Sequence, residues 1–234
     1  MVKIAQKLEK ALFINRENRF VGTIKIHNRV EKCHIMNPGR MIHFLIPGAQ
    51  VLVEDRSSPT RKLRSSLLYV LHPDSLILID SQLPNAIVNE GLHNKKLVEF
   101  NNVQKIQREI PYGTEMRSRI DFLLDDSIYL EVKATNYVEN QIGYFPDAPT
   151  KRGQKHLQEL MAIQNSQNGI QTYVLFLAQR TDIEEIRPFE KIDPKFTRLL
   201  HKAKKSGTEI LGYSINFKKN GSEVYIGSSL PIEL

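Results

Sequence analysis

The stretch that decides the fold of the second half is residues 119–133, which read RIDFLLDDSIYLEVK. Two alternating runs flank the turn-forming triplet Asp125-Asp126-Ser127, and this arrangement predicts a β-hairpin. A turn centred on the middle residue of the triplet places Asp121 directly opposite Glu131. Lys133 then shares a face of the sheet with Glu131, because side chains alternate between the two faces of a strand. The apolar side chains that point to the other face, into the core, are Ile120, Phe122, Leu130 and Val132.

Two carboxylates facing each other across a hairpin repel, which destabilises the sheet. A divalent cation between Asp121 and Glu131 reverses the sign of that effect, since Mg²⁺ and Mn²⁺ prefer hard oxygen ligands. Lys133 is then placed to contact a phosphate oxygen or to assist a metal-dependent hydrolysis. The alternative is that the acids face solvent or are neutralised by neighbouring cations. Those cations are Arg117, Arg119 and Lys133.

A metal site of this kind calls for a third acid. Glu90, in a segment that can form a helix from Asn85 to Leu92, is our choice, and Glu109 and Glu115 compete for the role. Asn85 is the expected N-cap of that helix.

A second candidate feature is the basic start of a helix expected over residues 150–165. Lys151, Arg152 and Lys155 lie where the helix dipole favours acidic side chains, so a bound anion is expected there, and a nucleic-acid phosphate fits best. The alternative is that Asp147 and Glu159 neutralise the cluster. For Tyr144 and Phe145 two roles stay open, stacking on bases or packing inside the protein. We expect His156 to be a polar support rather than a metal ligand.

The positive charge of the chain is concentrated in its first third. The whole chain carries 33 Lys and Arg against 26 Asp and Glu, a net charge of +7. Residues 1–80 contain 13 of these cations and 7 of these anions, which leaves +6 of the +7 in this part. A basic module beside a nearly neutral one indicates a polyanionic partner, although such an excess can also serve solubility alone. An exposed basic loop is expected from Arg56 to Arg64.

The pattern of short runs predicts two domains of different class. Within residues 1–80, β-type runs at 11–14, 20–26, 51–53, 67–71 and 76–79 alternate with turn signals and predict a small closed barrel. From residue 83, the order helix, three strands, helix, strand predicts an α/β domain with a mixed sheet. A helix opening at Asp193-Pro194 and a hairpin around Asn220-Gly221 complete it. The expected domains are residues 1–82 and 83–234.

Other features exclude several classes of protein. The longest apolar run is far shorter than the roughly 20 residues of a membrane helix, and no secretory signal is visible. The single cysteine, Cys33, forms neither an internal disulfide nor a cysteine metal cage. We therefore expect a cytoplasmic protein.

Several unusual strings, in order along essentially the whole chain, resemble the sugar fermentation stimulation protein A (SfsA) family. The strings are NPGRM at 37–41, PGA at 47–49, RSRIDF at 117–122, EVK at 131–133, GYFPDA at 143–148 and RGQKHL at 152–157. The resemblance implies an N-terminal OB-type β-barrel that binds nucleic acid, followed by a PD-(D/E)xK nuclease-like α/β domain. In that nuclease pattern Asp121 is the first acid, Glu131 the second, Lys133 the catalytic lysine and Glu90 the acid from the first helix.

The resemblance also implies a DNA-binding protein without strong sequence specificity, which acts as a regulator of sugar metabolism. Our main hypothesis is a DNA-binding, metal-dependent nuclease that uses Mg²⁺ or Mn²⁺; the alternatives are a non-cleaving DNA-binding regulator and an oligosaccharide-binding barrel. The side chains expected to contact DNA are Arg40, Arg56, Arg61, Lys62 and Arg64 in the barrel and Lys151, Arg152 and Lys155 on the later helix.

Overall fold

The computed structural model describes residues 1–5, 7–56, 60–113, 118–166 and 169–234. The chain forms two compact units. The first unit contains Met1–Gly91, Gln179–Asp182 and Ser214–Gly227, and the second contains Leu92–Ala178, Ile183–Tyr213 and Ser228–Leu234. Two strands near the end of the chain, β15 (Glu209–Lys218) and β16 (Glu223–Leu230), contribute residues to both units. The domain limits expected from the sequence, at residues 82 and 83, stay a prediction.

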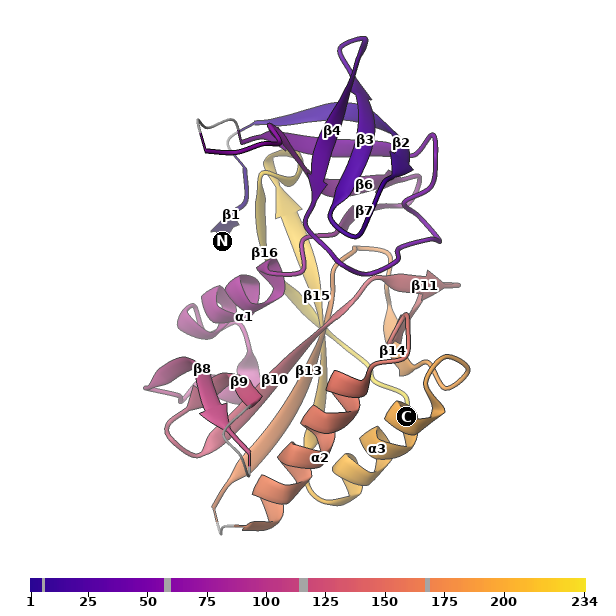
Figure 1. The fold of residues 1–234 in the computed structure, drawn as a ribbon. Helices are drawn as coiled ribbons and strands as arrows, with labels where there is room; N and C mark the ends of the chain where they lie inside the picture. Colours follow the sequence, from indigo (N-terminus) through magenta and orange to yellow (C-terminus); the bar gives the residue numbers. More distant parts are fainter. Residues whose placement is uncertain (6, 57–59, 114–117, 167–168) are drawn as a thin grey trace. The chain divides into compact units, whose positions relative to one another are not determined.

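Five strands of the first unit close into a barrel (Figure 1). They are β2 (Leu8–Arg16), β3 (Val21–Ile26), β4 (Arg29–Ile35), β5 (Gln50–Asp55) and β6 (Ser65–His72). The order β4-β3-β2-β5-β6 is antiparallel throughout, and a parallel pairing of β4 with β6 closes the cylinder. β7 (Ser75–Leu78) pairs with β6 outside this closure, and β1 (Val2–Lys3) pairs with β16. Closure leaves the barrel strands without a free edge.

The sequence predicts every barrel strand except β4. The first four residues of β4 include Arg29 and Glu31, which are typical of a loop, and only Cys33 and Ile35 of its seven residues are buried. The preceding turn contains His27 and Asn28, both at positive φ, which is the two-residue turn that joins tightly twisted antiparallel strands. Pairing with β3 and β6, rather than local propensity, therefore makes this segment a strand.

Cys33 lies fully buried in the barrel core, packed among apolar side chains. Burial raises the pKa of its thiol to about 12, so the reactive thiolate is scarce at neutral pH. We expect a thiol reagent such as DTNB to modify no cysteine in the folded protein at pH 8 and one per chain in guanidinium chloride. Rapid modification without denaturant, measured by absorbance, would contradict this burial.

The first helix, α1 (Leu83–His93), begins earlier than the sequence indicates. Asn85 lies inside the helix, so the expectation that it is the N-cap is wrong. The carboxylate of Asp80 instead accepts a hydrogen bond from the backbone N–H of Gln82, at 2.8 Å, just before the helix. Pro84 fits the first turn of α1. Backbone N–H groups there have no partner within the helix, so proline, which lacks this group, loses no hydrogen bond.

The second unit is built on a mixed sheet with the strand order β15-β13-β10-β9-β8. Its remaining strands are β8 (Ile106–Tyr112), β9 (Ser118–Leu124), β10 (Ile128–Thr135) and β13 (Gln171–Ala178). β10, β13 and β15 are parallel, while β8 and β9 are antiparallel to their neighbours. The parallel step from β10 to β13 requires a crossover, which α2 (Lys151–Ser166) supplies.

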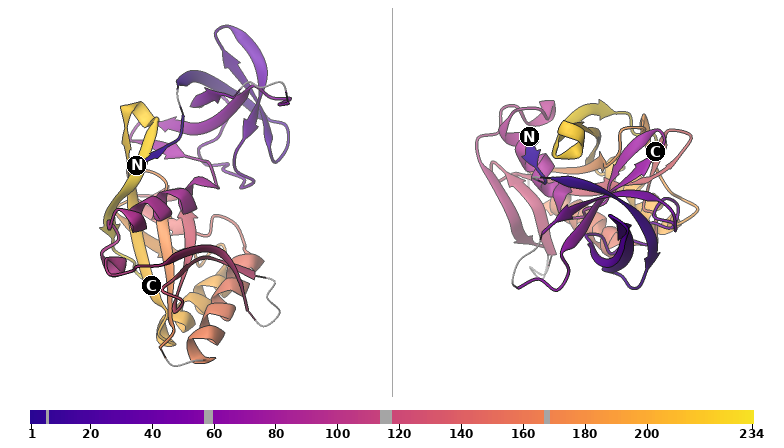
Figure 2. Two further views of the ribbon diagram at one scale, coloured as in Figure 1. Left: turned by 90° about the vertical axis from the view of Figure 1, so that its left-hand side faces the viewer. Right: turned by 90° about the horizontal axis from the view of Figure 1, so that it is seen from above.

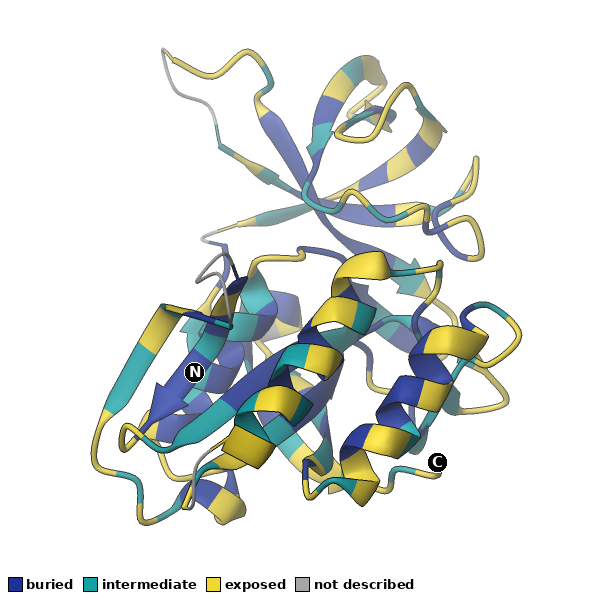
Figure 3. Cartoon of the chain, turned by 60° about the horizontal axis from the view of Figure 1, so that its bottom comes forward, coloured by how far each residue is buried: buried dark blue, intermediate teal, exposed yellow. Residues whose placement is uncertain are grey.

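Two helices cover one face of this sheet, as Figures 1 and 2 show: α2 and α3 (Pro194–Lys205). Each presents a buried stripe toward the sheet and an exposed stripe away from it (Figure 3). Between the helices and the sheet lies a core that includes Leu157, Leu160 and Phe176. Asp193 caps α3, and Gly207 follows it at φ +99°, so the limits predicted for this helix are confirmed.

A small sheet extends the second unit: β11 (Tyr137–Glu139), β12 (Ile142–Phe145) and β14 (Glu185–Pro188). The remaining short elements are the 3₁₀ turns η1 (Val98–Phe100) and η2 (Lys219–Gly221). Asn220 and Gly221 both have positive φ, in agreement with the predicted turn between β15 and β16. No helix in the described part of the chain is long and apolar enough to cross a membrane.

Candidate functional site

The predicted hairpin is present as β9 and β10, and the three pairs next to its turn follow the expected register, while direct pairing of Asp121 with Glu131 stays a prediction. Leu124 pairs with Ile128, Leu123 with Tyr129 and Phe122 with Leu130 around a three-residue turn. The turn has no glycine, but Asp125 and Asp126 adopt positive φ, at 47° and 58°. The Asp125 carboxylate also accepts two backbone N–H groups, from Gln104 at 3.0 Å and Lys105 at 2.7 Å. Those hydrogen bonds stabilise a backbone conformation that most residues avoid.

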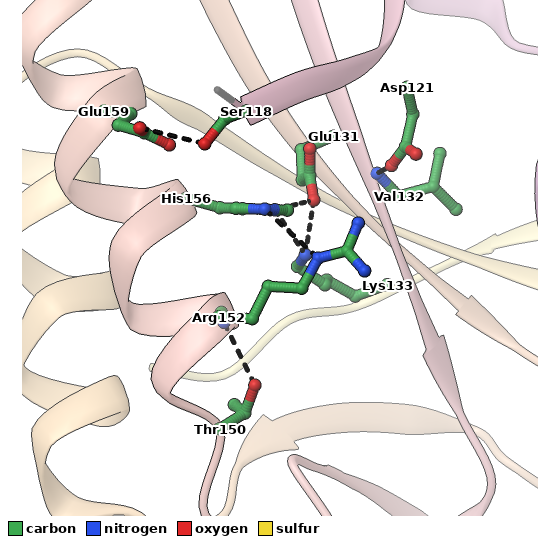
Figure 4. Close-up of polar contacts among 10 residues, drawn as sticks. Ser118, Asp121, Glu131, Val132, Lys133, Thr150, Arg152, His156 and Glu159 are labelled. Atoms are coloured by element: carbon green, nitrogen blue, oxygen red, sulfur yellow. Dashed lines mark hydrogen bonds and ion pairs between the residues drawn. The ribbon is translucent and has the colours of Figure 1, made fainter. Parts of the chain in front are cut away.

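Asp121 contacts the neighbouring strand through its side chain. One oxygen of its carboxylate accepts the backbone N–H of Val132 at 2.7 Å. This hydrogen bond attaches Asp121 to β10 beside Glu131 and Lys133, and Figure 4 shows the three residues. The two strands thus bring both predicted acids and the predicted lysine into one region of the sheet.

Glu131 is buried, with only 2% of its surface exposed. Its oxygen Oε1 accepts from Lys133 Nζ at 2.5 Å and contacts Nδ1 of His156 (Figure 4). Its other oxygen, Oε2, is buried and has no hydrogen-bond partner. Burial alone would raise the pKa of Glu131, but the interactions with Lys133 and His156 lower it by a larger amount. The pKa of this carboxyl therefore lies below its ordinary value.

His156 is the functional residue whose importance the sequence least reveals. It lies on the stripe of α2 that faces the sheet, and it is 4% exposed. Its Nδ1 faces Glu131, while its Nε2 lies 3.4 Å from the Nε of Arg152, one helical turn earlier. The expectation of a polar support agrees with these contacts, because both ring nitrogens face protein groups. The helical spacing of buried Gly153, Leu157 and Leu160 is the signal that places this ring inward.

The donor set fits a divalent cation that keeps part of its shell for other ligands. In the described residues of the second unit, no group of three or more His, Cys, Asp or Glu is arranged to hold a metal ion. However, the unpartnered Oε2 of Glu131 lacks the hydrogen bond that a buried carboxylate oxygen normally has. Mg²⁺ is commonly held by one or two carboxylates together with waters and substrate phosphates. Glu131 and Asp121 meet that requirement.

A second polar group lies on the same side of the second unit, where α2 meets β8 and β9. The Oε1 of Glu159 accepts from the hydroxyl of Ser118 at 2.9 Å, and Lys155 Nζ lies 3.5 Å from the same oxygen. The Oε2 of Glu159 and the hydroxyl of Tyr112 are buried without partners. Burial, followed by the charges of Glu131 and Glu159, raises the pKa of Tyr112. Glu159 therefore does offset part of the basic cluster, as one sequence interpretation held.

The start of α2 has a protein anion close by. Thr150 caps the helix by accepting the N–H of Gly153 at 3.0 Å, and the first turn contains no acidic residue. The carboxylate of Asp193, which comes from outside the helix, accepts the N–H of Thr150 at 2.9 Å. A phosphate is thus not needed to supply the anion expected there. Contact of Lys151, Arg152 and Lys155 with DNA stays a prediction.

The other candidates have varied surroundings. Glu90 belongs to the first unit, where its carboxylate pairs with the amino group of Met1, and its part in the site stays a prediction. Glu109 lies on β8 at φ +54°, and Glu115 and Arg117 lie outside the described residues. Tyr144 and Phe145 follow the packing alternative: Tyr144 lies 4.9 Å from Phe189 and Phe145 lies 5.4 Å from Phe176, measured between ring centroids.

The predicted DNA-contacting residues of the barrel differ in how they are paired. Arg56 pairs with Glu54, and Arg64 lies 3.8 Å from Asp55. Arg40, Arg61 and Lys62 are exposed. Residues 57–59 of the predicted basic loop lie outside the described residues.

Comparisons with known proteins agree with both halves of this architecture. Residues 14–79 match the SfsA N-terminal OB domain, and residues 82–221 match the sugar fermentation stimulation protein RE domain, a restriction-endonuclease-like α/β fold. The predicted OB-type barrel followed by a nuclease-like mixed-sheet domain is therefore confirmed.

Whole proteins from other organisms are similar over nearly the full chain. A sugar fermentation stimulation protein homolog of Clostridium botulinum strain Alaska E43 is 42% identical over 216 residues, which is 91% of this chain and 92% of the relative. The homolog of strain Hall is 37% identical over the whole of both chains. The structure of Pyrococcus furiosus SfsA in complex with Ca²⁺ superposes with a TM-score of 0.88 at 28% identity and covers both chains fully. By its two domains and its full-length relatives, this chain belongs to the sugar fermentation stimulation protein (SfsA) family.

Proposed function

We propose that this protein binds DNA and hydrolyses phosphodiester bonds with a divalent cation held by its second unit. The observation that carries the proposal is the buried Oε2 of Glu131, which has no partner although Asp121 and Lys133 lie on the same hairpin. Leaving a buried carboxylate oxygen unpaired costs free energy, and a cation would recover it. The Ca²⁺ complex of the related Pyrococcus protein supports a divalent cation in this family, and Mg²⁺ or Mn²⁺ is our choice for activity.

In this proposal each residue of the cluster has a distinct role. Asp121 and Glu131 hold the cation, and the bound cation supplies a Lewis acid for phosphate oxygens. Lys133 offsets the negative charge that develops on the phosphate as its bond to the leaving oxygen breaks. His156 is a positioning residue, because it orients Glu131 through Oε1 and leaves Oε2 for the cation.

The test is a cleavage assay with the full chain. Supercoiled plasmid and circular single-stranded DNA are incubated with protein and Mg²⁺ or Mn²⁺, with an EDTA arm for each substrate. We expect metal-dependent nicking or linearisation on agarose gels. DNA that stays intact with every metal and substrate would eliminate the hydrolytic part of the proposal.

One observation favours a second candidate function, a DNA-binding protein that does not cleave. Lys133 already forms an ion pair with Glu131, so a protein cation offsets the charge of that buried carboxylate. A nuclease fold does not by itself imply nuclease activity. In this case the cleavage assay leaves the DNA intact while fluorescence anisotropy still detects binding, and the protein acts as a regulator that binds DNA without strong sequence preference.

Both functions predict that DNA affinity depends steeply on salt. Each neutralised phosphate of duplex DNA contributes about −0.9 to the slope of log K against log salt, so five contacts give a slope of about −4.5. We expect Lys62→Ala to reduce the steepness by about 1 and Lys204→Ala, on α3, to leave it unchanged. Fluorescence anisotropy between 50 and 200 mM salt measures this slope for each protein. A flat response would count against phosphate recognition altogether.

A further inference from the structure

Phe20 is an exposed aromatic residue in an arginine-rich part of the barrel. It ends the turn between β2 and β3, and 46% of its surface is accessible. Among the described residues, it is the only aromatic side chain in the set of exposed large hydrophobic residues. The accessible part of this ring is free to contact a molecule outside the barrel, and an aromatic face can stack on a nucleic-acid base.

The turn that presents Phe20 is held in one conformation by hydrogen bonds. The side-chain oxygen of Asn18 accepts the backbone N–H groups of Phe20, at 2.9 Å, and Val21, at 3.0 Å. The guanidinium of Arg16 donates to carbonyl oxygens on this turn and on a second loop. Those acceptors are Asn18, Arg19, Asn37, Gly39 and Arg40. Arg16 thereby joins the two loops, and a surface already ordered in this way loses less entropy when it binds a ligand.

The two loops line an open pocket of about 390 Å³ with a positive lining. The lining residues are Arg16, Asn18, Arg19, Pro38, Arg40 and Ile42. The lining contains three arginines and no acid, and Ile42 is 62% exposed. Positive charge next to apolar surface matches a ligand that combines anionic groups with flat apolar ones, as nucleotides do.

A second ring and further positive charge lie beside Phe20. The ring of His34, on β4, lies 6.4 Å from that of Phe20 between centroids, with an angle of 37° between their planes. Burial, then the charges of Arg61 and Arg56, lower the pKa of His34, while Asp80 acts in the opposite direction. The imidazole is therefore neutral at pH 7 and adds flat surface, and the arginine charges add an attraction for phosphate.

We infer that Phe20, with the pocket formed by its turn and the neighbouring loop, binds single-stranded DNA by stacking on an unpaired base while Arg19 and Arg40 contact its phosphates. This inference rests on the proposed DNA binding and specifies the form of DNA. A duplex offers its phosphates to the arginines but keeps its bases stacked in pairs, whereas a single strand offers an open base face. Single strands should therefore bind more tightly here than duplexes of the same length.

The test uses the absence of tryptophan from the chain. Phe20→Trp introduces one tryptophan at the proposed stacking position, and Val30→Trp, at a 64% exposed position near the other end of β4, is the matched control. Titration with oligo(dT) in EDTA, where metal-dependent cleavage cannot occur, should quench Phe20→Trp strongly and Val30→Trp little. An equal response of both tryptophans would overturn the inference.

Affinity measurements complete the test. Stacking is worth about 1–3 kcal/mol per base, so Phe20→Ala should weaken oligo(dT) binding roughly 5- to 150-fold, and Phe20→Tyr should restore it. Duplex affinity should change little. Equal losses on both forms of DNA, or quenching by maltooligosaccharide in place of DNA, would refute single-strand recognition. If the protein binds duplex DNA but Phe20→Ala changes neither affinity, this inference is refuted and the proposed DNA binding remains. If the protein binds no DNA of either form, both proposals are refuted.

Discussion

Lys133→Met should reduce metal-dependent DNA cleavage by about 10²- to 10³-fold, the range found when a single transition-state charge contact is removed. Asp121→Asn and Glu131→Gln should reduce it at least as much, because each removes a negative charge that holds the cation. The substitutions preserve side-chain size closely. Initial rates of plasmid nicking in Mg²⁺ measure the effect.

The control lies on the same hairpin. Asp126 is an exposed carboxylate whose oxygen lies 2.7 Å from Lys105 Nζ, so Asp126→Asn removes one acid without touching the cluster. It should cleave at the wild-type rate. Circular dichroism and DNA binding in EDTA show whether the inactive variants are folded.

A readout that does not depend on activity separates metal binding from a structural defect. Ca²⁺ should raise the melting temperature of the wild type and of Lys133→Met, because a ligand that binds only the folded state stabilises it. It should not raise that of Glu131→Gln. If Asp121→Asn and Glu131→Gln nicked plasmid at the wild-type rate, these carboxylates would not hold a catalytic metal.

Asp193→Ala should lower the free energy of unfolding by about 2–4 kcal/mol. Asp193 is 3% exposed, and its carboxylate accepts hydrogen bonds from Phe196 N at 2.9 Å, Thr150 N at 2.9 Å and Gln154 Nε2 at 2.9 Å. Loss of an N-cap costs about 0.5–2 kcal/mol, and the other buried donors add to that cost. Asp193 joins the starts of α2 and α3, so both helices should be affected.

The pH dependence of Asp193 has a definite sign. Burial opposes ionisation, but the hydrogen bonds from Thr150, Phe196 and Gln154 outweigh it and hold the pKa of Asp193 below its ordinary value. A carboxyl with a lowered folded-state pKa stabilises the protein above its unfolded pKa of about 3.9. That contribution is lost as the pH falls through the folded value.

Urea denaturation monitored by circular dichroism at pH 7 and at pH 3 checks both statements. Asp193→Asn should lose less stability than Asp193→Ala, because it keeps one acceptor oxygen, and it should lack the part of the acid sensitivity that Asp193 provides. Glu190→Ala, which removes an exposed carboxylate three residues earlier, is the control. Equal stability of Asp193→Ala and Glu190→Ala would show that the cap contributes nothing.

The local elements of this protein are evident in its sequence. Alternation with a period of two, together with a polar triplet, determines the β9–β10 register, because a slip by one residue would turn Phe122 and Leu130 away from the core. That register alone brings Asp121, Glu131 and Lys133 to one region. The helix beginning after Asp193 is equally local, since its cap and its proline are adjacent in sequence.

Contacts between distant segments were decided only by the tertiary structure. The inward position of His156 against Glu131 depends on how α2 packs on the sheet, and the bond from Thr150 to Asp193 depends on where α3 begins. β4 became a strand because β3 and β6 pair with it, although its own charged residues favour a loop. Short-range patterns specify period and turns, whereas the partner of a buried polar group is set by packing between segments far apart in the chain.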